Sequence, residues 1–432
     1  MNSALPNIII KRILTLIYED DMVLYQGYNR FYNSIGSTTS KFKNHWGKRY
    51  CFVNWSWFEM CRSLYNSNFI NLRDIEIKFS QGIGNSHNKY RYITSDLVQK
   101  IKIDYFELNT NLCDILKKNC LELLRCIRIE NQDDSIDFMG DFNNLYYLRK
   151  ACSDGGKDLE IEFDFHVGRL REEERKRIVQ YSQAKRVHNG GNLEVSLLKI
   201  TFSQIDTDHN SIILGQLVKN LLPRSLVCLS KGPDSIRCYK EISTVKQFEH
   251  VVIQDTVPLG ALYQFLQSNR LETLSFFLRF TDLRLFDLFI VNPDIPLGVR
   301  EEEYSLWRSC LESIRNHTKL TYLSISDQNK CCNLFPRSTI DDIVDTFSNN
   351  KSIKELFFNL RSNLIEMDAG FNQITFMSAN VLVPILDNNS VLETLYLPHM
   401  VKDIDIDALI QHIQATTTNT KCIIKKKINE NI

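Results

Sequence analysis

The chain has 432 residues, of which 43% are hydrophobic and 24% are charged, as in an ordinary globular protein with a large core. Lys+Arg and Asp+Glu are both 52, and this net charge of zero argues against a nucleic-acid-binding protein that relies on bulk positive charge. No apolar run approaches the roughly 18 residues of a membrane span, so no membrane partner is expected. Lys11 and Arg12 interrupt the only N-terminal apolar stretch, which argues against a signal peptide.

A small helical module is predicted over residues 1–68. Residues 5–18 have apolar side chains three or four apart, and Pro6 suits a first helical turn. Residues 25–47 are polar and rich in Ser and Thr, which predicts a long internal loop. A second helix is predicted from Arg49 to Tyr65, with Val53, Trp57, Cys61 and Leu64 on one face.

Residues 69–257 contain a divergent repeat. The phrase apolar-x-x-apolar-x-apolar begins at residues 72, 124 and 195, and each occurrence predicts a short strand. Residues 158–165 alternate apolar and acidic side chains, which is typical of a strand with one buried face.

The same phrase is clearer in residues 258–432. It begins at residues 271, 320, 353 and 392, in steps of 49, 33 and 39 residues. Predicted helices precede the four phrases at 259–267, 307–315, 341–347 and 380–387, and a fifth helix at 406–414 leads to a last strand at 421–425. Residues 281–306, with two prolines and three consecutive glutamates, are predicted to be an excursion from the repeat.

One helix and one short strand cannot bury their apolar faces alone, but stacked copies share a continuous core. Parallel neighbouring strands need crossover connections, which the helices would supply. The pattern therefore predicts an α/β fold, an irregular solenoid of alternating helices and short parallel strands. It resembles the leucine-rich-repeat family, especially the ribonuclease-inhibitor-like type. It departs from that family because Arg279, Gln328, Arg361 and Met400 stand where the family carries Asn. The alternative is a compact α/β domain whose strands share a pattern by chance.

Two N-terminal segments resemble an F-box. They are Leu5-Pro6-x-x-Ile9-x-x-x-Ile13 and Phe52-Val53-Asn-Trp-Ser-Trp57-Phe58. The family's F-box binds the Skp adaptor of cullin–RING ubiquitin ligases, and repeats that follow it hold the substrate. The resemblance implies that the adaptor contacts Leu5, Pro6, Ile9, Ile13, Val53, Trp57 and Phe58. The alternative is that these helices cap the first repeat.

The sequence carries none of several common catalytic motifs. The sequence has no phosphate-binding Gly-rich loop, no G-x-S-x-G and no H-E-x-x-H. Its 12 cysteines include no C-x-x-C pair, and most lie among apolar residues, which predicts free buried thiols in a reducing compartment. The expectation is a cytoplasmic or nuclear protein that is not an enzyme and has no metal site and no cofactor.

Binding is predicted on the strand face that the helices leave open. Strand side chains alternate, so the positions between the apolar ones form columns across neighbouring strands. The predicted partner-binding residues are Ser275, Phe277, Tyr322, Ser324, Phe357, Asn359 and Tyr396. The resulting prediction is a non-catalytic substrate receptor of an SCF-type ubiquitin ligase. The alternatives are a repeat scaffold without any ligase role and, third, a hydrolase or transferase whose catalytic groups assemble only in space.

Overall fold

The structure is a computed structural model, and its strands follow one another in the order of the chain. It describes residues 59–60, 62–63, 69–71, 98–105, 123–130, 149, 159–167, 194–202, 207–230, 239–279, 301–326, 338–359, 379–398, 405–418 and 421–427. These residues form an α/β fold whose strands pair in an open sheet in the order β1 to β12. Among these ranges, no helix combines the length and the apolar character needed to cross a membrane.

The chain divides into two compact units, and the division falls within β4. Unit 1 comprises residues 1–130 and 140–162, and unit 2 comprises residues 131–139 and 163–432. Unit 1 holds β1 (Phe69–Asn71), β2 (Lys100–Asp104), β3 (Cys126–Glu130) and the first residues of β4 (Glu160–Val167). β1 pairs with β2 and β2 with β3, both in parallel. Their core side chains include Ile101, Ile103, Ile127 and Ile129, each at most 1% exposed.

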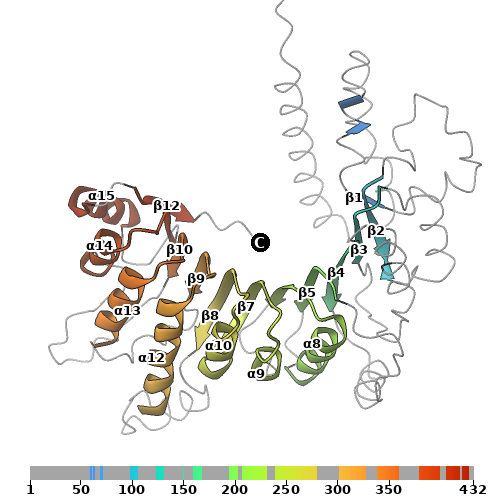
Figure 1. Cartoon of the computed structure of the whole chain (residues 1–432), viewed down its shortest axis with the longest axis horizontal. Coiled ribbons are helices and arrows are strands. Elements are labelled where there is room, and N and C mark those ends of the chain that lie inside the picture. The colour runs from blue at the N-terminus through green and yellow to red at the C-terminus, as the bar shows by residue number, and fades with distance from the viewer. Residues whose placement is uncertain are drawn as a thin grey trace, which may run out of the picture. The chain divides into compact units, whose positions relative to one another are not determined.

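Unit 2 alternates strands with helices. In chain order after β4, its elements are β5 (Leu197–Phe202), α8 (Thr207–Leu221), β6 (Ser225–Ser230), α9 (Tyr239–Ile242), β7 (His250–Pro258), α10 (Leu259–Leu266), β8 (Thr273–Arg279), α12 (Glu301–Asn316), β9 (Tyr322–Ser326), α13 (Ser338–Asn349), β10 (Glu355–Asn359), α14 (Ala379–Asn388), β11 (Thr394–Pro398), α15 (Ile406–Thr416) and β12 (Ile423–Lys427). Consecutive strands from β5 to β12 pair in parallel, and the helices lie along one side of them (Figure 1).

The core of unit 2 lies between its strands and its helices. Leu323 and Ile325 of β9 are buried on the helix side, as are Leu356 of β10 and Leu395 of β11. α12 contributes its apolar face, including the fully buried Trp307. Burying one such side chain contributes roughly 1.5–3 kcal/mol. None of the described helices lies on the opposite face of these strands, which is called the helix-free face below.

A ladder of polar side chains fixes the turns between the helices and β8 to β11. Its members are Ser268, His317, Asn350 and Asn389, each three residues before the start of a strand phrase. Nδ2 of Asn350 donates to the Ile314 carbonyl at 2.6 Å, while its Oδ1 accepts from the Ile353 N–H at 2.7 Å. Asn389 repeats both bonds with Phe347 and Leu392. Each turn is thereby bonded to the preceding repeat.

The strand phrases and the five helices predicted in residues 258–432 are confirmed, as are the strands predicted near residues 124, 158 and 195. The first apolar residue of each phrase lies two positions before the strand and is buried in the turn. α12 begins at Glu301 and so takes in the last residues of the segment predicted as an excursion, whereas residues 280–300 lie outside the described ranges. The strand predicted at residue 72 also falls outside them. β1, β2, β6, β7, α8 and α9 were not predicted.

Candidate functional site

The helix-free face of unit 2 carries the columns that the alternation predicts. Ser275 is in register with Ser324, Ser324 with Phe357, and Phe357 with Tyr396. A second column runs along the same strands through Phe277, Ser326 and Asn359. The register therefore brings all the predicted partner-binding residues together, with Tyr322 in the flanking column beside Glu355.

Burial divides these residues into two groups. Ser324 is 3% exposed and Phe357 is 8% exposed, whereas Ser275, Tyr322 and Tyr396 are half-buried. Neighbouring strands in a sheet lie only about 4.8 Å apart, so a large ring covers the small residue beside it. Among the aromatic side chains whose burial the structure describes on this face, Tyr322 and Tyr396 are the ones partly open to solvent.

Tyr396 is the centre of a polar network across three strands. Its hydroxyl donates to Oε2 of Glu355 at 3.1 Å, and the Lys425 ammonium lies 6.0 Å from its ring centroid. Partial burial, followed by the hydrogen bond to the Glu355 carboxylate and its charge, raises the pKa of the Tyr396 phenol. The phenol therefore stays protonated near neutral pH and keeps its donor. An aromatic ring between an acid and a base resembles the centre of many protein-binding surfaces.

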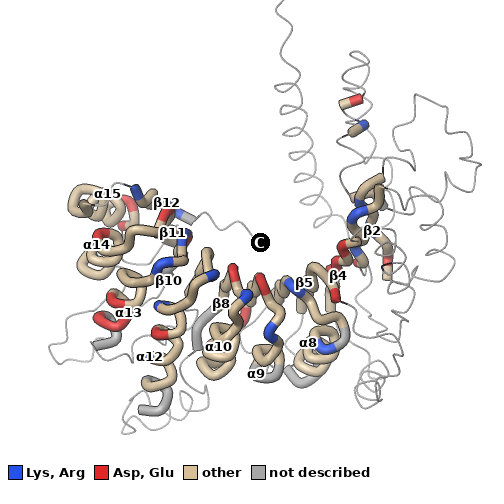
Figure 2. Tube along the Cα trace, in the orientation of Figure 1, with Lys and Arg blue, Asp and Glu red and all other residues tan. Residues whose placement is uncertain are grey.

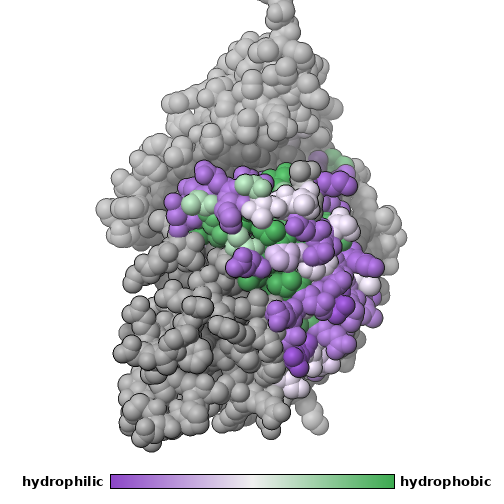
Figure 3. All heavy atoms as spheres, turned by 90° about the vertical axis from the view of Figure 1, so that its left-hand side faces the viewer, coloured by the Kyte–Doolittle hydropathy of each residue, from purple (hydrophilic) through white to green (hydrophobic). Residues whose placement is uncertain are grey.

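The end of unit 2 that carries α15 and β12 mixes apolar and charged side chains. Ile423 is 56% exposed, and hydrophobic surface lies among hydrophilic residues at this end (Figure 3). β12 also carries three consecutive lysines, of which Lys426 pairs with Asp407. Both signs of charge are interspersed along the described elements (Figure 2). This arrangement suits a protein partner better than a polyanion.

In unit 1 the polar face of the strands is held by ion pairs. Lys102 pairs with Glu130 at 2.9 Å, and the Arg128 guanidinium binds Oε2 of Glu162 through Nη2 at 2.5 Å and Nε at 2.7 Å. The same guanidinium lies 4.0 Å from the centroid of the Phe69 ring. Arg128 is thereby held between an aromatic ring and a carboxylate.

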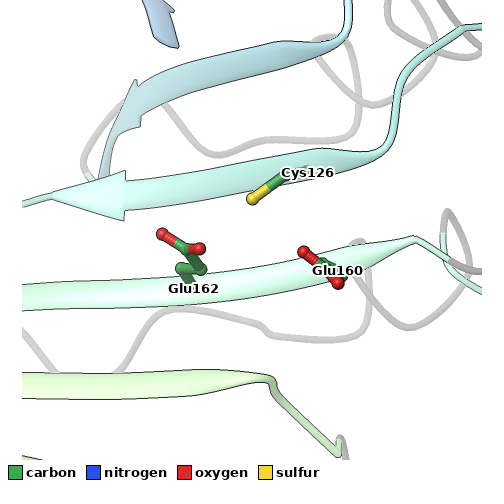
Figure 4. Close-up of side chains that lie close together, drawn as sticks. All are labelled: Cys126, Glu160 and Glu162. Carbon is green, nitrogen blue, oxygen red and sulfur yellow. The ribbon is translucent and has the colours of Figure 1, made fainter. Parts of the chain in front are cut away.

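Beside Arg128 lies a cluster of one thiol and two carboxylates. Cys126 of β3 and Glu160 and Glu162 of β4 each place a potential ligand atom within 4.8 Å of the others (Figure 4). Cys126 is 1% exposed, Glu162 is half-buried and Glu160 is exposed. Burial, and then the charges of both glutamates, raise the pKa of the Cys126 thiol to about 12. The thiol is therefore a poor nucleophile.

Sequence reasoning missed this cluster. The period-2 pattern of residues 158–165 puts Glu160 and Glu162 on one face, and the phrase at residue 124 puts Cys126 on the polar face of its strand. Only the pairing of β3 with β4 makes the three residues neighbours, because 34 positions separate Cys126 from Glu160. The expected solenoid places consecutive strands side by side, but the sequence did not predict the register of β4 against β3, which the bond from the Glu160 N–H to the Arg125 carbonyl fixes.

The predicted adaptor-binding residues cannot be placed. Leu5, Pro6, Ile9, Ile13, Val53, Trp57 and Phe58 all lie outside the described residues. No family model and no curated protein matches the sequence.

Proposed function

We propose that this chain is a non-catalytic protein-interaction protein whose partner binds the helix-free face of β9 to β12. The observation that carries the proposal is the network of Tyr322, Glu355, Tyr396 and Lys425 on that face. Two half-buried tyrosines can bury more surface on binding at a small cost in side-chain entropy. The acid and the base beside them offer charged hydrogen bonds that orient a partner.

We also propose that the repeats form a leucine-rich-repeat-like solenoid. Support comes from the chain-order pairing of the strands in unit 2 and from the described helices, which lie along one side of these strands. The ladder of Ser268, His317, Asn350 and Asn389 adds to it, since polar side chains that bond backbone groups of adjacent turns recur along stacked repeats.

The F-box resemblance supports a more specific role. A chain that holds a Skp-type adaptor through Ile13 and Trp57 and a protein through unit 2 acts as a substrate receptor of a cullin–RING ubiquitin ligase. The second candidate is a repeat scaffold without a ligase role, favoured if the partner face binds but the N-terminal residues do not.

Three variants of the full chain separate these roles in a pull-down read by mass spectrometry. The adaptor variant is Ile13→Asp with Trp57→Ala, and the face variant is Tyr322→Ala with Tyr396→Ala. The control is Tyr263→Ala, which removes a half-buried tyrosine from helix α10. Circular dichroism confirms that each variant is folded.

The receptor role predicts that the adaptor variant loses the Skp adaptor and the cullin but keeps the partner. The face variant should show the reverse, and Tyr263→Ala should lose neither. If wild type recovers no adaptor while the face variant loses a partner, the scaffold role stands instead. Retention of every partner by a folded face variant would overturn the proposed binding face.

A further inference from the structure

We propose that Cys126, Glu160 and Glu162 bind a thiophilic divalent cation, with Zn²⁺ the best fit, on the polar face of unit 1. Sequence analysis predicted no metal site, and the proposed partner face in unit 2 does not involve these residues. The three side chains come from the neighbouring strands β3 and β4 and converge on one point (Figure 4).

The geometry is close to that of a three-ligand zinc site. Tetrahedral zinc with oxygen and sulfur ligands places those ligands about 3.3 to 3.5 Å apart. In the structure the three potential ligand atoms lie within 4.8 Å of one another. Glu160 is exposed and makes no ion pair with another described residue, so its side chain is free to turn inward. One coordination position then remains for water.

The buried thiol is the second observation. Cys126 is 1% exposed, although it belongs to the polar face rather than the apolar core beneath it. Its described side-chain hydrogen bond is to Glu162, inside the cluster. Its sulfur lies within 4.8 Å of a carboxylate oxygen of each glutamate, where it is well placed to coordinate a cation.

Charge and hydrogen bonding agree with a divalent ion. A thiolate and two carboxylates carry three negative charges, which a divalent cation and the Arg128 guanidinium together neutralise. Both bonds from Arg128 go to Oε2 of Glu162, so Oε1 of the same carboxylate can coordinate the metal. Arg128 is itself fixed against Phe69 at 4.0 Å. Outer partners of this kind orient metal ligands.

The donor set selects among metals. A thiolate ligand disfavours Mg²⁺ and Ca²⁺, which take oxygen ligands in larger numbers, and favours Zn²⁺ or its spectroscopic substitute Co²⁺. On binding, the Sγ–H proton passes to solvent as the sulfur–metal bond forms, so no oxidant or reductant is needed. The metal would tie β3 to β4.

The test is a titration of the reduced full-length protein with Co²⁺, in which binding is measured by the thiolate-to-cobalt absorption band. The affinity for Zn²⁺ is then measured by its displacement of the bound Co²⁺. Variants are Cys126→Ser, Glu160→Gln and, as control, Cys422→Ser, which changes a partly exposed cysteine outside the cluster. One equivalent of cobalt should give the absorption in wild type and Cys422→Ser. Mutation of a residue that only orients a metal ligand lowers metal affinity by about 10- to 100-fold. Loss of a ligand should cost at least as much, so we expect the affinity for Co²⁺ to fall at least about 10-fold in Glu160→Gln and about 100-fold in Cys126→Ser.

Zn²⁺ should also raise the midpoint of the thermal transition of unit 1 in wild type and Cys422→Ser and leave that of Cys126→Ser unchanged. The proposal is overturned if wild type gives no thiolate-to-cobalt absorption, or if Glu160→Gln binds cobalt as tightly as wild type. Glu160→Gln changes an exposed side chain, so it decides the matter even if Cys126→Ser does not fold.

Discussion

Asn350 shows how much one side chain contributes to the repeat turns. It is 1% exposed and bonds the carbonyls of Ile314 and Arg315 and the N–H groups of Ser352 and Ile353. Asn350→Ala leaves buried backbone groups without partners, which should lower the free energy of unfolding by about 2–3 kcal/mol. Urea denaturation measures the change.

The neighbouring Asn349 provides the control for this experiment. It is exposed and bonds only within its own helix, to Asp345, so Asn349→Ala should cost under about 1 kcal/mol. Equal losses in the two variants would show that the turn bonds of Asn350 contribute nothing beyond an ordinary surface amide.

His317 gives the ladder a dependence on pH. Its Nδ1 accepts from the Leu320 N–H at 3.0 Å, and its Nε2 lies 3.1 Å from the Ser268 carbonyl, which assigns the proton to Nε2. Burial lowers the pKa of His317 below its ordinary 6.5. Because the neutral ring is favoured in the fold, its contribution is complete above pH 6.5 and is lost as pH falls through the lower folded pKa.

The variant His317→Asn isolates this effect. Asparagine makes the equivalent bonds at positions 350 and 389, so the variant should keep stability at pH 7.5 to within about 1 kcal/mol. Urea denaturation from pH 7.5 to pH 5 should show a smaller loss of stability in the variant than in wild type. Parallel pH curves for the two proteins would contradict the assignment.

At the scale of single elements, α14 contains an unfavourable residue. Pro384 lies inside this helix, where proline is about 3 kcal/mol less favourable than alanine. Proline also restricts the unfolded chain, which offsets about 1 kcal/mol of that cost. Pro384→Ala should therefore raise the free energy of unfolding by about 2 kcal/mol, as measured by chemical denaturation. A decrease would mean that the proline ring makes packing contacts worth more than the missing helix bond.

The sequence predicted the elements of residues 258–432 well because two periods reinforce each other there. Leu262, Phe265 and Leu266 follow a helical spacing, while Leu274 and Phe276 alternate as in a strand, and all five are buried. β6 and β7 were missed for a physical reason. β6 holds the continuous apolar run Leu226-Val-Cys-Leu229 and β7 the shorter run Val251-Val-Ile253, and such runs do not distinguish a strand from a buried helix.

The residues of the candidate sites could be predicted from the sequence only in part. The columns on the partner face follow from alternation within each repeat, so Tyr322 and Tyr396 were found. The sequence placed them on an open face, yet it could not reveal that Phe357 is nearly buried, because that depends on how neighbouring side chains cover one another. The resemblance to leucine-rich repeats predicts a turn asparagine after each strand, whereas Asn350 and Asn389 lie before the strands.

At the scale of the whole molecule, the two compact units should unfold separately, because each has its own core. Ile127 in unit 1 and Leu323 in unit 2 are both fully buried. Truncation of either to alanine costs about 2–5 kcal/mol. Calorimetry should resolve two transitions, with Ile127→Ala lowering one midpoint and Leu323→Ala the other. A single transition that both substitutions lower equally would contradict independent units.

The chain-order pairing of strands has a consequence for synthesis. Each described strand of unit 2 pairs with the strand made just before it, so its pairing does not depend on a strand that is still to be translated. Unit 2 can therefore fold from its N-terminal to its C-terminal strands as the chain leaves the ribosome, because each new strand pairs with a strand that is already in place. Nascent chains stalled after β10 should accordingly protect β5 to β9 from protease, whereas a fold that needs its last strand first would leave them open to cleavage.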